Sequence, residues 1–154
     1  MTSSISSLNE AQISQLSLSS VRGLSAADIQ SLRTTQVAAF AVTQIEALSS
    51  TQLTALSTTQ MKALTATQIG ALSSSQISVF SATQLSVLLD AQIDAFGEED
   101  IAALSTQQIK GLTATELGEF STNQFRALSA TQLSALSATQ LKGLTTTVRG
   151  ELTT

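Results

Sequence analysis

The sequence contains no proline, cysteine, tryptophan, tyrosine or histidine, and each absence narrows what the chain can do. Without cysteine it forms no disulfide bond, and without cysteine or histidine it lacks the commonest nucleophile and general base. Only 12% of its 154 residues are charged, about half the usual share. The net charge of −4 and the scattering of the basic residues argue against nucleic-acid binding, which needs clustered lysine and arginine.

Long apolar runs are also missing, since none approaches the roughly 20 residues that a membrane-spanning helix needs. The first residues, MTSSISSLNEAQ, lack the basic and apolar regions of a secretory signal peptide. The sequence therefore predicts no membrane insertion and no signal peptide at this end.

An eight-residue repeat runs through the whole chain without an insertion or deletion. We number the slots of this octad by the remainder left when a residue number is divided by eight. Slot 0 holds Leu or Phe in every octad from Leu8 to Leu152, and slot 5 is apolar everywhere from Ile13 onward except at Arg149. The unit is L-[ST]-x-T-Q-[IL]-x-A, starting at slot 0. Residues 1–154 thus form a single repeat domain of about nineteen octads, of which the last is irregular.

The octad fits a short helix that begins again in every repeat. In one long helix the apolar stripe would rotate by roughly 80° per octad, which no coiled coil tolerates. In the octad of Leu128, Ser129 stands at an N-cap with Gln132 three residues later, as in a capping box. Leu128 and Leu133 flank this start as the two halves of a hydrophobic staple. We therefore predict an all-α solenoid of very short helices, with a β-solenoid, favoured by the many Thr and Ile residues, as the alternative.

The same frame assigns each slot a direction. We expect Leu, Ile and Ala of slots 0, 5 and 7 to face the axis, and slots 2, 3 and 6 to face water. Asp28, Asp100 and Glu116 replace the slot-4 glutamine and suit the positive start of a helix. Gly97 is a tolerated cap, whereas Leu89 is not, so Asp90 is expected to cap its helix one residue late.

The acidic residues are concentrated in LDAQIDAFGEED, residues 89–100. Carboxylate oxygens suit calcium, so a weak candidate metal site consists of Asp90, Asp94, Glu98, Glu99 and Asp100. The spacing matches neither an EF-hand nor a calcium-binding β-helix. The alternative is local: Glu98, Glu99 and Asp100 stabilise the first turn of a helix.

Slot 3 carries a column of threonines. If the octads stack in register, their hydroxyl groups are expected to form a regular array that binds ice or glycans. The alternative is that these positions hold threonine because the first turn of a helix favours small polar residues. The absence of Tyr and Trp counts against glycan stacking. The column consists of Thr35, Thr43, Thr51, Thr59, Thr67, Thr83, Thr115, Thr131, Thr139 and Thr147.

The octad resembles the L-[ST]-[ST]-x-Q-[IV]-x-A tracts of very large bacterial repeat proteins, often labelled adhesins or haem-utilisation proteins. The resemblance covers nearly the whole chain and implies a bacterial structural module that is surface-related or secreted, here by a route without an N-terminal signal peptide. Haem finds no ligand, because Met1 and Met61 are poor substitutes for the missing His, Cys and Tyr. The resemblance therefore assigns no cofactor and no site residue.

The sequence thus predicts a non-catalytic structural repeat module, serving as a rigid spacer, a surface element or a self-assembling filament subunit. Head-to-tail self-association is expected because neither end is strongly polar. Val148 and Arg149 break the pattern in the last octad and could form a polar cap. The alternative is an interaction scaffold that binds a protein or glycan, with residues 89–100 as its best candidate patch. No catalytic residue, and hence no enzyme, is predicted.

Overall fold

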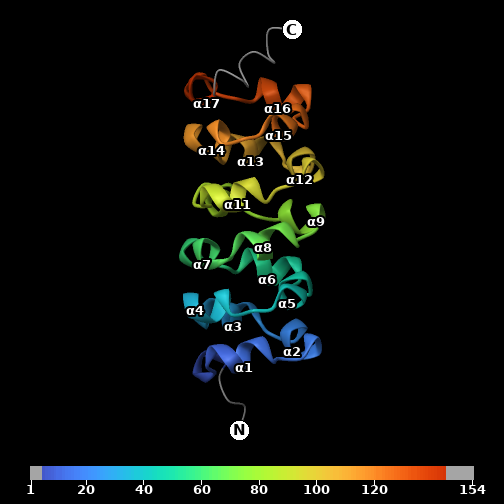
Figure 1. The fold of residues 1–154 in the computed structure, drawn as a ribbon, viewed down its shortest axis with the longest axis vertical. Helices are drawn as coiled ribbons and strands as arrows, with labels where there is room; N and C mark the ends of the chain where they lie inside the picture. Colours follow the sequence, from blue (N-terminus) through green and yellow to red (C-terminus); the bar gives the residue numbers. More distant parts are fainter. Residues whose placement is uncertain (1–4, 145–154) are drawn as a thin grey trace.

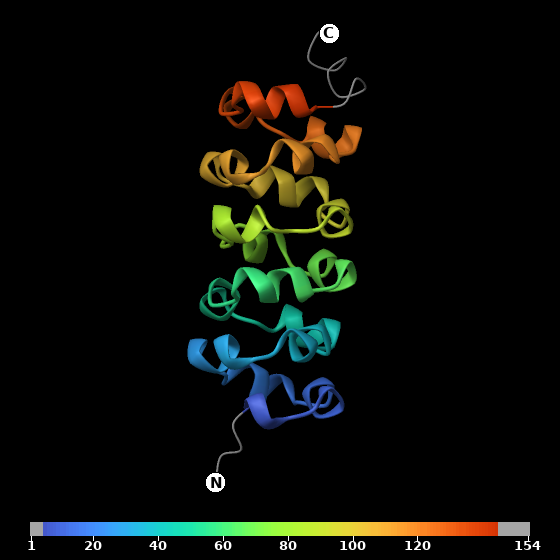
Figure 2. The ribbon, with the colours of Figure 1, turned by 90° about the vertical axis from the view of Figure 1, so that its left-hand side faces the viewer.

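The structure is a computed structural model that describes residues 5–144, and over this range it is an all-α rod of stacked superhelical turns (Figure 1). The two ends of the described chain lie at opposite ends of the rod, and a view turned by 90° shows the same stack (Figure 2). Within residues 5–144 there is no strand, so the all-α solenoid is confirmed and the β-solenoid alternative is wrong. Val148, Arg149 and Thr147 lie outside the described residues. None of the described helices is long and apolar enough to cross a membrane.

The described part contains 17 α-helices of four to six residues after one 3₁₀ helix, η1. In chain order they are η1 (Ile5–Ser7), α1 (Glu10–Ser14), α2 (Leu18–Arg22), α3 (Ala26–Ser31), α4 (Thr34–Ala38), α5 (Val42–Glu46), α6 (Ser50–Thr54), α7 (Thr58–Ala63), α8 (Ala66–Gly70), α9 (Ser74–Ile77), α10 (Ala82–Leu85), α11 (Asp90–Asp94), α12 (Glu98–Ala103), α13 (Thr106–Gly111), α14 (Ala114–Gly118), α15 (Thr122–Arg126), α16 (Ala130–Ser134) and α17 (Ala138–Gly143).

The predicted capping box sets where the helices begin, except in α2, where the Ser17 hydroxyl accepts from the N–H of Ser20 without a reverse bond. Ser129 is an N-cap with extended backbone, its hydroxyl accepts from the N–H of Gln132, and its own N–H donates to Gln132 Oε1 at 2.7 Å. Each helix ends when the chain turns at slot 0, where, for example, the N–H of Leu56 donates to the carbonyl oxygen of Leu53. No described residue has a positive φ, so ordinary L-residues make every one of these turns.

Four caps have no side-chain oxygen to offer the helix, namely Arg33, Ala41, Leu89 and Gly97. Here only the reverse half of the box remains, as in the N–H of Leu89 donating to Gln92 Oε1 at 2.8 Å. Gly97 is a cap as expected, but the predicted late cap at Asp90 is wrong, because Asp90 is the first helical residue. The reverse bond holds the frame, while the Leu89 side chain is left 52% exposed.

Slots 0 and 5 build one continuous core along the rod, and in slot 5 every residue from Ile13 to Phe125 is at most 3% exposed. Slot 3 faces water throughout, and slot 6 does so with few exceptions. Slot 2 differs from its prediction, because residues such as Ala66, Ala82 and Ala114 are half-buried. Ala82 and Ala114 lie against slot 7 of the helix three octads later, at Gly111 and Gly143. Slot 7 is itself half-buried in every octad from Ala39 to Ala95.

The pitch of the superhelix follows from these contacts between turns. Helices three octads apart pack on each other, as α10 does on α13 and α14 on α17. Slot-4 side chains reach further, to the helix four octads earlier, as Gln52 of α6 does to Val21 of α2. One turn of the superhelix therefore takes between three and four octads.

Candidate functional site

The acidic segment predicted as a weak metal site is split over two helices. Asp90 and Asp94 are the first and last residues of α11, and Glu98, Glu99 and Asp100 form the first turn of α12. Within residues 5–144 no group of three or more His, Cys, Asp or Glu side chains is placed to hold a metal ion. The structure thus does not bring these five carboxylates together, and calcium binding keeps no geometric support.

Asp100 serves its own helix instead. Its Oδ2 accepts a hydrogen bond of 2.9 Å from the N–H of Gly97, the reverse half of a capping box. Burial is the main cause that raises the pKa of Asp100, and the neighbouring charge of Glu99 raises it further, against the lowering effect of the Gly97 bond. The local interpretation of the acidic segment, as the start of a helix, is the one that the geometry supports.

The dominant polar feature is a row of slot-4 glutamines, all buried except the half-buried Gln76, which we call the glutamine ladder. In each of them Oε1 accepts from the slot-1 N–H of its own octad, while Nε2 donates to the carbonyl oxygen of the residue 28 positions earlier and, except in Gln76, to that of the residue 31 positions earlier. The ladder consists of Gln36, Gln44, Gln52, Gln60, Gln68, Gln76, Gln84, Gln92, Gln108, Gln124, Gln132 and Gln140.

Gln60 shows the geometry of one rung. Its side chain is 3% exposed, and its Oε1 accepts from the N–H of Ser57 at 2.8 Å. Its Nε2 donates to the carbonyl oxygens of Ile29 and Leu32 at 2.7 and 2.8 Å. A buried amide with all these partners joins two turns of the rod and also closes its own cap, so a single side chain links local and tertiary structure.

The octad pattern predicts only a capping role for these glutamines, and their bond between turns was not predicted. The signal was present, because a capping box accepts Glu as readily as Gln, yet slot 4 holds Gln in thirteen octads and Glu only at Glu116. A carboxylate has no N–H to donate. The preference for the amide therefore marks a second partner that accepts hydrogen bonds.

The first superhelical turn shows what happens where no earlier turn exists in the chain. Its slot-4 residues include Gln12, Ser20 and Asp28, for which no residue lies 28 or more positions earlier. Gln12 is exposed and makes only the capping box with Asn9. Asp28 does the same with Ser25, whose hydroxyl and backbone N–H lower its pKa. Slot 4 therefore varies between Gln, Ser and Asp in the first turn, where its side chain has no earlier turn to bind.

The start of the rod is fastened by Arg33. Its Nη1 and Nη2 donate to the carbonyl oxygens of Ser6 and Leu8 at 2.8 and 3.2 Å, beside the Gln36 rung on the same residues. A hydrogen bond with Thr35 is the main cause that lowers the pKa of the exposed Glu10 carboxyl, and the positive charge of Arg33 lowers it further. At this slot 1, Arg33 replaces the usual Ser or Thr, and its guanidinium group holds η1 and Leu8 in place.

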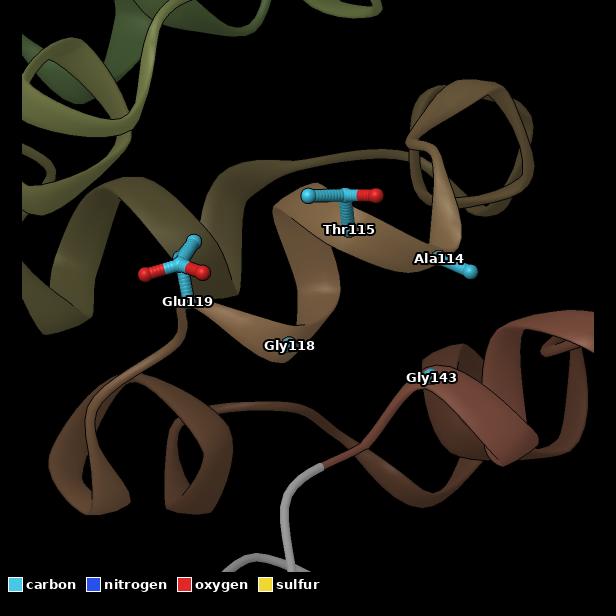
Figure 3. A pocket seen from close by; sticks show the side chains of 5 residues that line it. All are labelled: Ala114, Thr115, Gly118, Glu119 and Gly143. Carbon is cyan, nitrogen blue, oxygen red and sulfur yellow. The ribbon is translucent and has the colours of Figure 1, made fainter.

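A hollow of about 310 Å³ lies between α14 and α17, lined by Ala114, Thr115, Gly118, Glu119 and Gly143 (Figure 3). It arises at a close approach of two backbones, because a Cβ on Gly118 would lie 2.8 Å from the carbonyl oxygen of Gly143. A Cβ on Gly143 would collide with the backbone and side chain of Ala114. The lining offers one hydroxyl, from Thr115, and one carboxylate, from Glu119.

The threonine column is exposed at all nine of its described positions, which are Thr35, Thr43, Thr51, Thr59, Thr67, Thr83, Thr115, Thr131 and Thr139. Because a turn takes between three and four octads, successive threonines face different sides of the rod. Those on one side come from different turns. Binding of ice or glycans by this array stays a prediction.

Comparison with known families identifies the repeat over part of the chain. A family model described as the ALTTAQ repeat matches residues 42–74, from the start of α5 to the start of α9. The name corresponds to slots 7 to 4, as in ALSTTQ at residues 55–60, which end on a rung of the ladder. The chain matches no curated protein. The match supports a repeat family, as expected, and gives no support to the adhesin and haem-utilisation labels.

Proposed function

We propose that the chain is a non-catalytic structural module that acts as a rigid spacer or surface element. The observation that carries the proposal is the glutamine ladder, which is unbroken over eight successive octads from Gln36 to Gln92. It lies beside a core that is continuous along the rod. A solenoid held by equal bonds between neighbouring turns spreads a load over many units.

Small-angle X-ray scattering on chains of different length tests the spacer role. Duplicating residues 49–80 adds four whole octads, which leaves every slot in frame. We expect the particle to lengthen at constant cross-section and its melting temperature to stay equal or rise. A duplicated chain that is wider rather than longer, or that melts earlier, would contradict a rigid spacer.

Head-to-tail assembly into a filament is a second candidate, favoured by the apolar residues at the two ends. Leu8, Leu16 and Leu24 are only half-buried at the start of the rod, and Leu141 is 39% exposed at its other end. Contacts between unlike ends do not close and so give fibres. Negative-stain electron microscopy over a range of concentrations should show fibres that Leu141→Glu abolishes. Single rods at every concentration would contradict the filament and leave the rigid spacer as the remaining candidate.

An interaction scaffold for a protein or glycan is the alternative, and its supporting observation is the exposed Leu89 beside the acidic residues of α11 and α12. A glycan array tests whether the partner is a glycan. Binding that Leu89→Ser removes would favour the scaffold, and an array without binding would limit it to protein partners.

A further inference from the structure

The ladder has two gaps between Gln36 and Gln140, both filled by acids. Along this stretch the slot-4 residues run Gln92, Asp100, Gln108, Glu116 and Gln124, so an acid replaces every second rung. Neither acid carries an N–H that could donate to the preceding turn. Of the four slot-4 residues in α11 to α14, only Gln92 and Gln108 are therefore bonded to the preceding turn.

Glu116 occupies its slot as the glutamines do. Its side chain is 5% exposed, and its Oε2 accepts from the N–H of Thr113, as each ladder Oε1 accepts from slot 1. The carbonyl oxygens 31 and 28 positions earlier belong to Leu85 and Leu88, which is where a glutamine Nε2 would donate. The ionised carboxyl group thus brings only acceptors to a place that asks for a donor.

The packing of the helices is also loose here. Helices three octads apart pack on each other along most of the rod, but α11 and α14, like α6 and α9, are not among the closely packed pairs. Their slots 2 and 7 hold Asp90 and Glu119, both exposed, where other turns place half-buried small residues such as Ala82 opposite Gly111.

Charge around Glu116 is mixed, and one group acts on it. The charged side chains of the neighbouring helices are Asp90 and Asp94 of α11, Lys110 of α13, Arg126 of α15 and Lys142 of α17, and α10 carries none. Among these, Asp90 is the group whose charge raises the pKa of Glu116. The carboxyl group is therefore both buried and next to another negative charge.

We propose that α11 to α14 form a proton-sensitive joint in the rod, in which the Glu116 side chain links the two turns only while it carries a proton. The protonated carboxyl group has one O–H, which donates to the carbonyl oxygen of Leu85 or Leu88 in place of the glutamine amide. When that proton leaves to water, the bond is lost and the carboxylate faces carbonyl lone pairs. The rod is stiff at this turn in mild acid and opens more readily at neutral pH.

The direction of the pKa of Glu116 agrees with this geometry. Burial is the main cause that raises it above 4.5, and Asp90 adds to the rise, while the hydrogen bonds from Thr113 lower it. A group whose pKa is higher in the folded chain stabilises the fold below its ordinary pKa. That stabilisation is lost as the pH rises through the raised value.

The test compares the chain with Glu116→Gln from pH 4.5 to pH 8. Because the variant restores the amide, its melting temperature should exceed that of the unchanged chain by about 2–8 °C at pH 8. The two values should converge toward pH 4.5. The control Glu119→Gln removes an exposed charge from the same helix and should move the melting temperature by less than about 2 °C. The joint would be overturned if Glu116→Gln did not melt above the unchanged chain at pH 8. It would also be overturned if the difference in melting temperature were the same at every pH.

Two local measurements separate the joint from a general effect of charge. The carboxyl carbon of Glu116 should titrate by NMR above the ordinary range of a glutamate, and a titration within that range would overturn the proposal. At pH 8, amide exchange in α14 and at residues 85–88 should be several-fold slower in Glu116→Gln than in the unchanged chain. Equal protection in the two proteins would also contradict the joint.

Discussion

Changing one rung from amide to carboxylate tests the ladder directly, and Gln60→Glu is the sharpest choice. The substitution keeps the shape of the side chain and its acceptor for the N–H of Ser57. It removes both hydrogen bonds to the carbonyl oxygens of Ile29 and Leu32. Since these atoms are buried, little water is at hand to replace the lost donor.

The magnitude follows from the two carbonyl groups that lose their partner. Each buried acceptor left without a donor costs about 1–3 kcal/mol, so Gln60→Glu should lower the free energy of unfolding by about 2–6 kcal/mol. For a chain of this length that lowers the melting temperature by about 5–20 °C. The loss should shrink as the pH falls, because protonation returns one donor to the side chain.

The matched control is Gln12→Glu, the same substitution in a slot without an earlier turn. Gln12 is exposed and makes only its capping box with Asn9, a role that Glu fills as well. We expect a change within about 0.5 kcal/mol. Urea unfolding followed by circular dichroism at neutral pH measures both. Equal losses in the two variants would refute the ladder as the bond between turns and reduce the slot to its capping role.

Two further pairs probe the core and the backbone contacts. Leu72→Asp should destabilise the chain by more than about 4 kcal/mol, because it buries an unpaired charge, whereas Leu8→Asp, at a half-buried end position, should cost far less; equal melting temperatures would contradict the solenoid core. Gly143→Ala should cost about 1–3 kcal/mol through overpacking against the backbone of α14. Gly23→Ala, in the same slot but with its nearest atom at an ordinary 3.4 Å, should be neutral or slightly stabilising; calorimetry on this pair that shows no difference would refute the close approach.

Local rules were enough to predict the helices, because every octad contains its own start and stop. The N-cap, the reverse bond and the staple lie within six residues, as in Leu128 to Leu133, and the apolar slots 0 and 5 identify the core. The frame even overrides a poor cap, since Leu89 keeps the register through Gln92. The late cap predicted at Asp90 is wrong because the bond from the N–H of Leu89 to Gln92 keeps the helix start in the frame of the repeat.

Relations between turns could not be predicted from the octad. The number of octads per turn depends on the angle at each cap, which the packing of helices 24 residues apart decides. The partners of each glutamine amide lie 28 and 31 residues earlier, beyond any local rule. Half-burial of slot 2 was missed for the same reason, because the helix that covers it belongs to the next turn.

The ladder also determines which changes of length the chain can survive. Removing or duplicating a whole octad leaves each glutamine opposite equivalent carbonyl groups, because all octads offer the same slots. Losing a single residue shifts every rung whose bond spans the break, so about four successive octads lose their partners at once. Unequal recombination in multiples of eight codons is therefore a permitted route of evolution for this chain, while a one-codon slip is not. The frame from Leu8 to Leu152, which has no insertion or deletion, is what this constraint on length predicts.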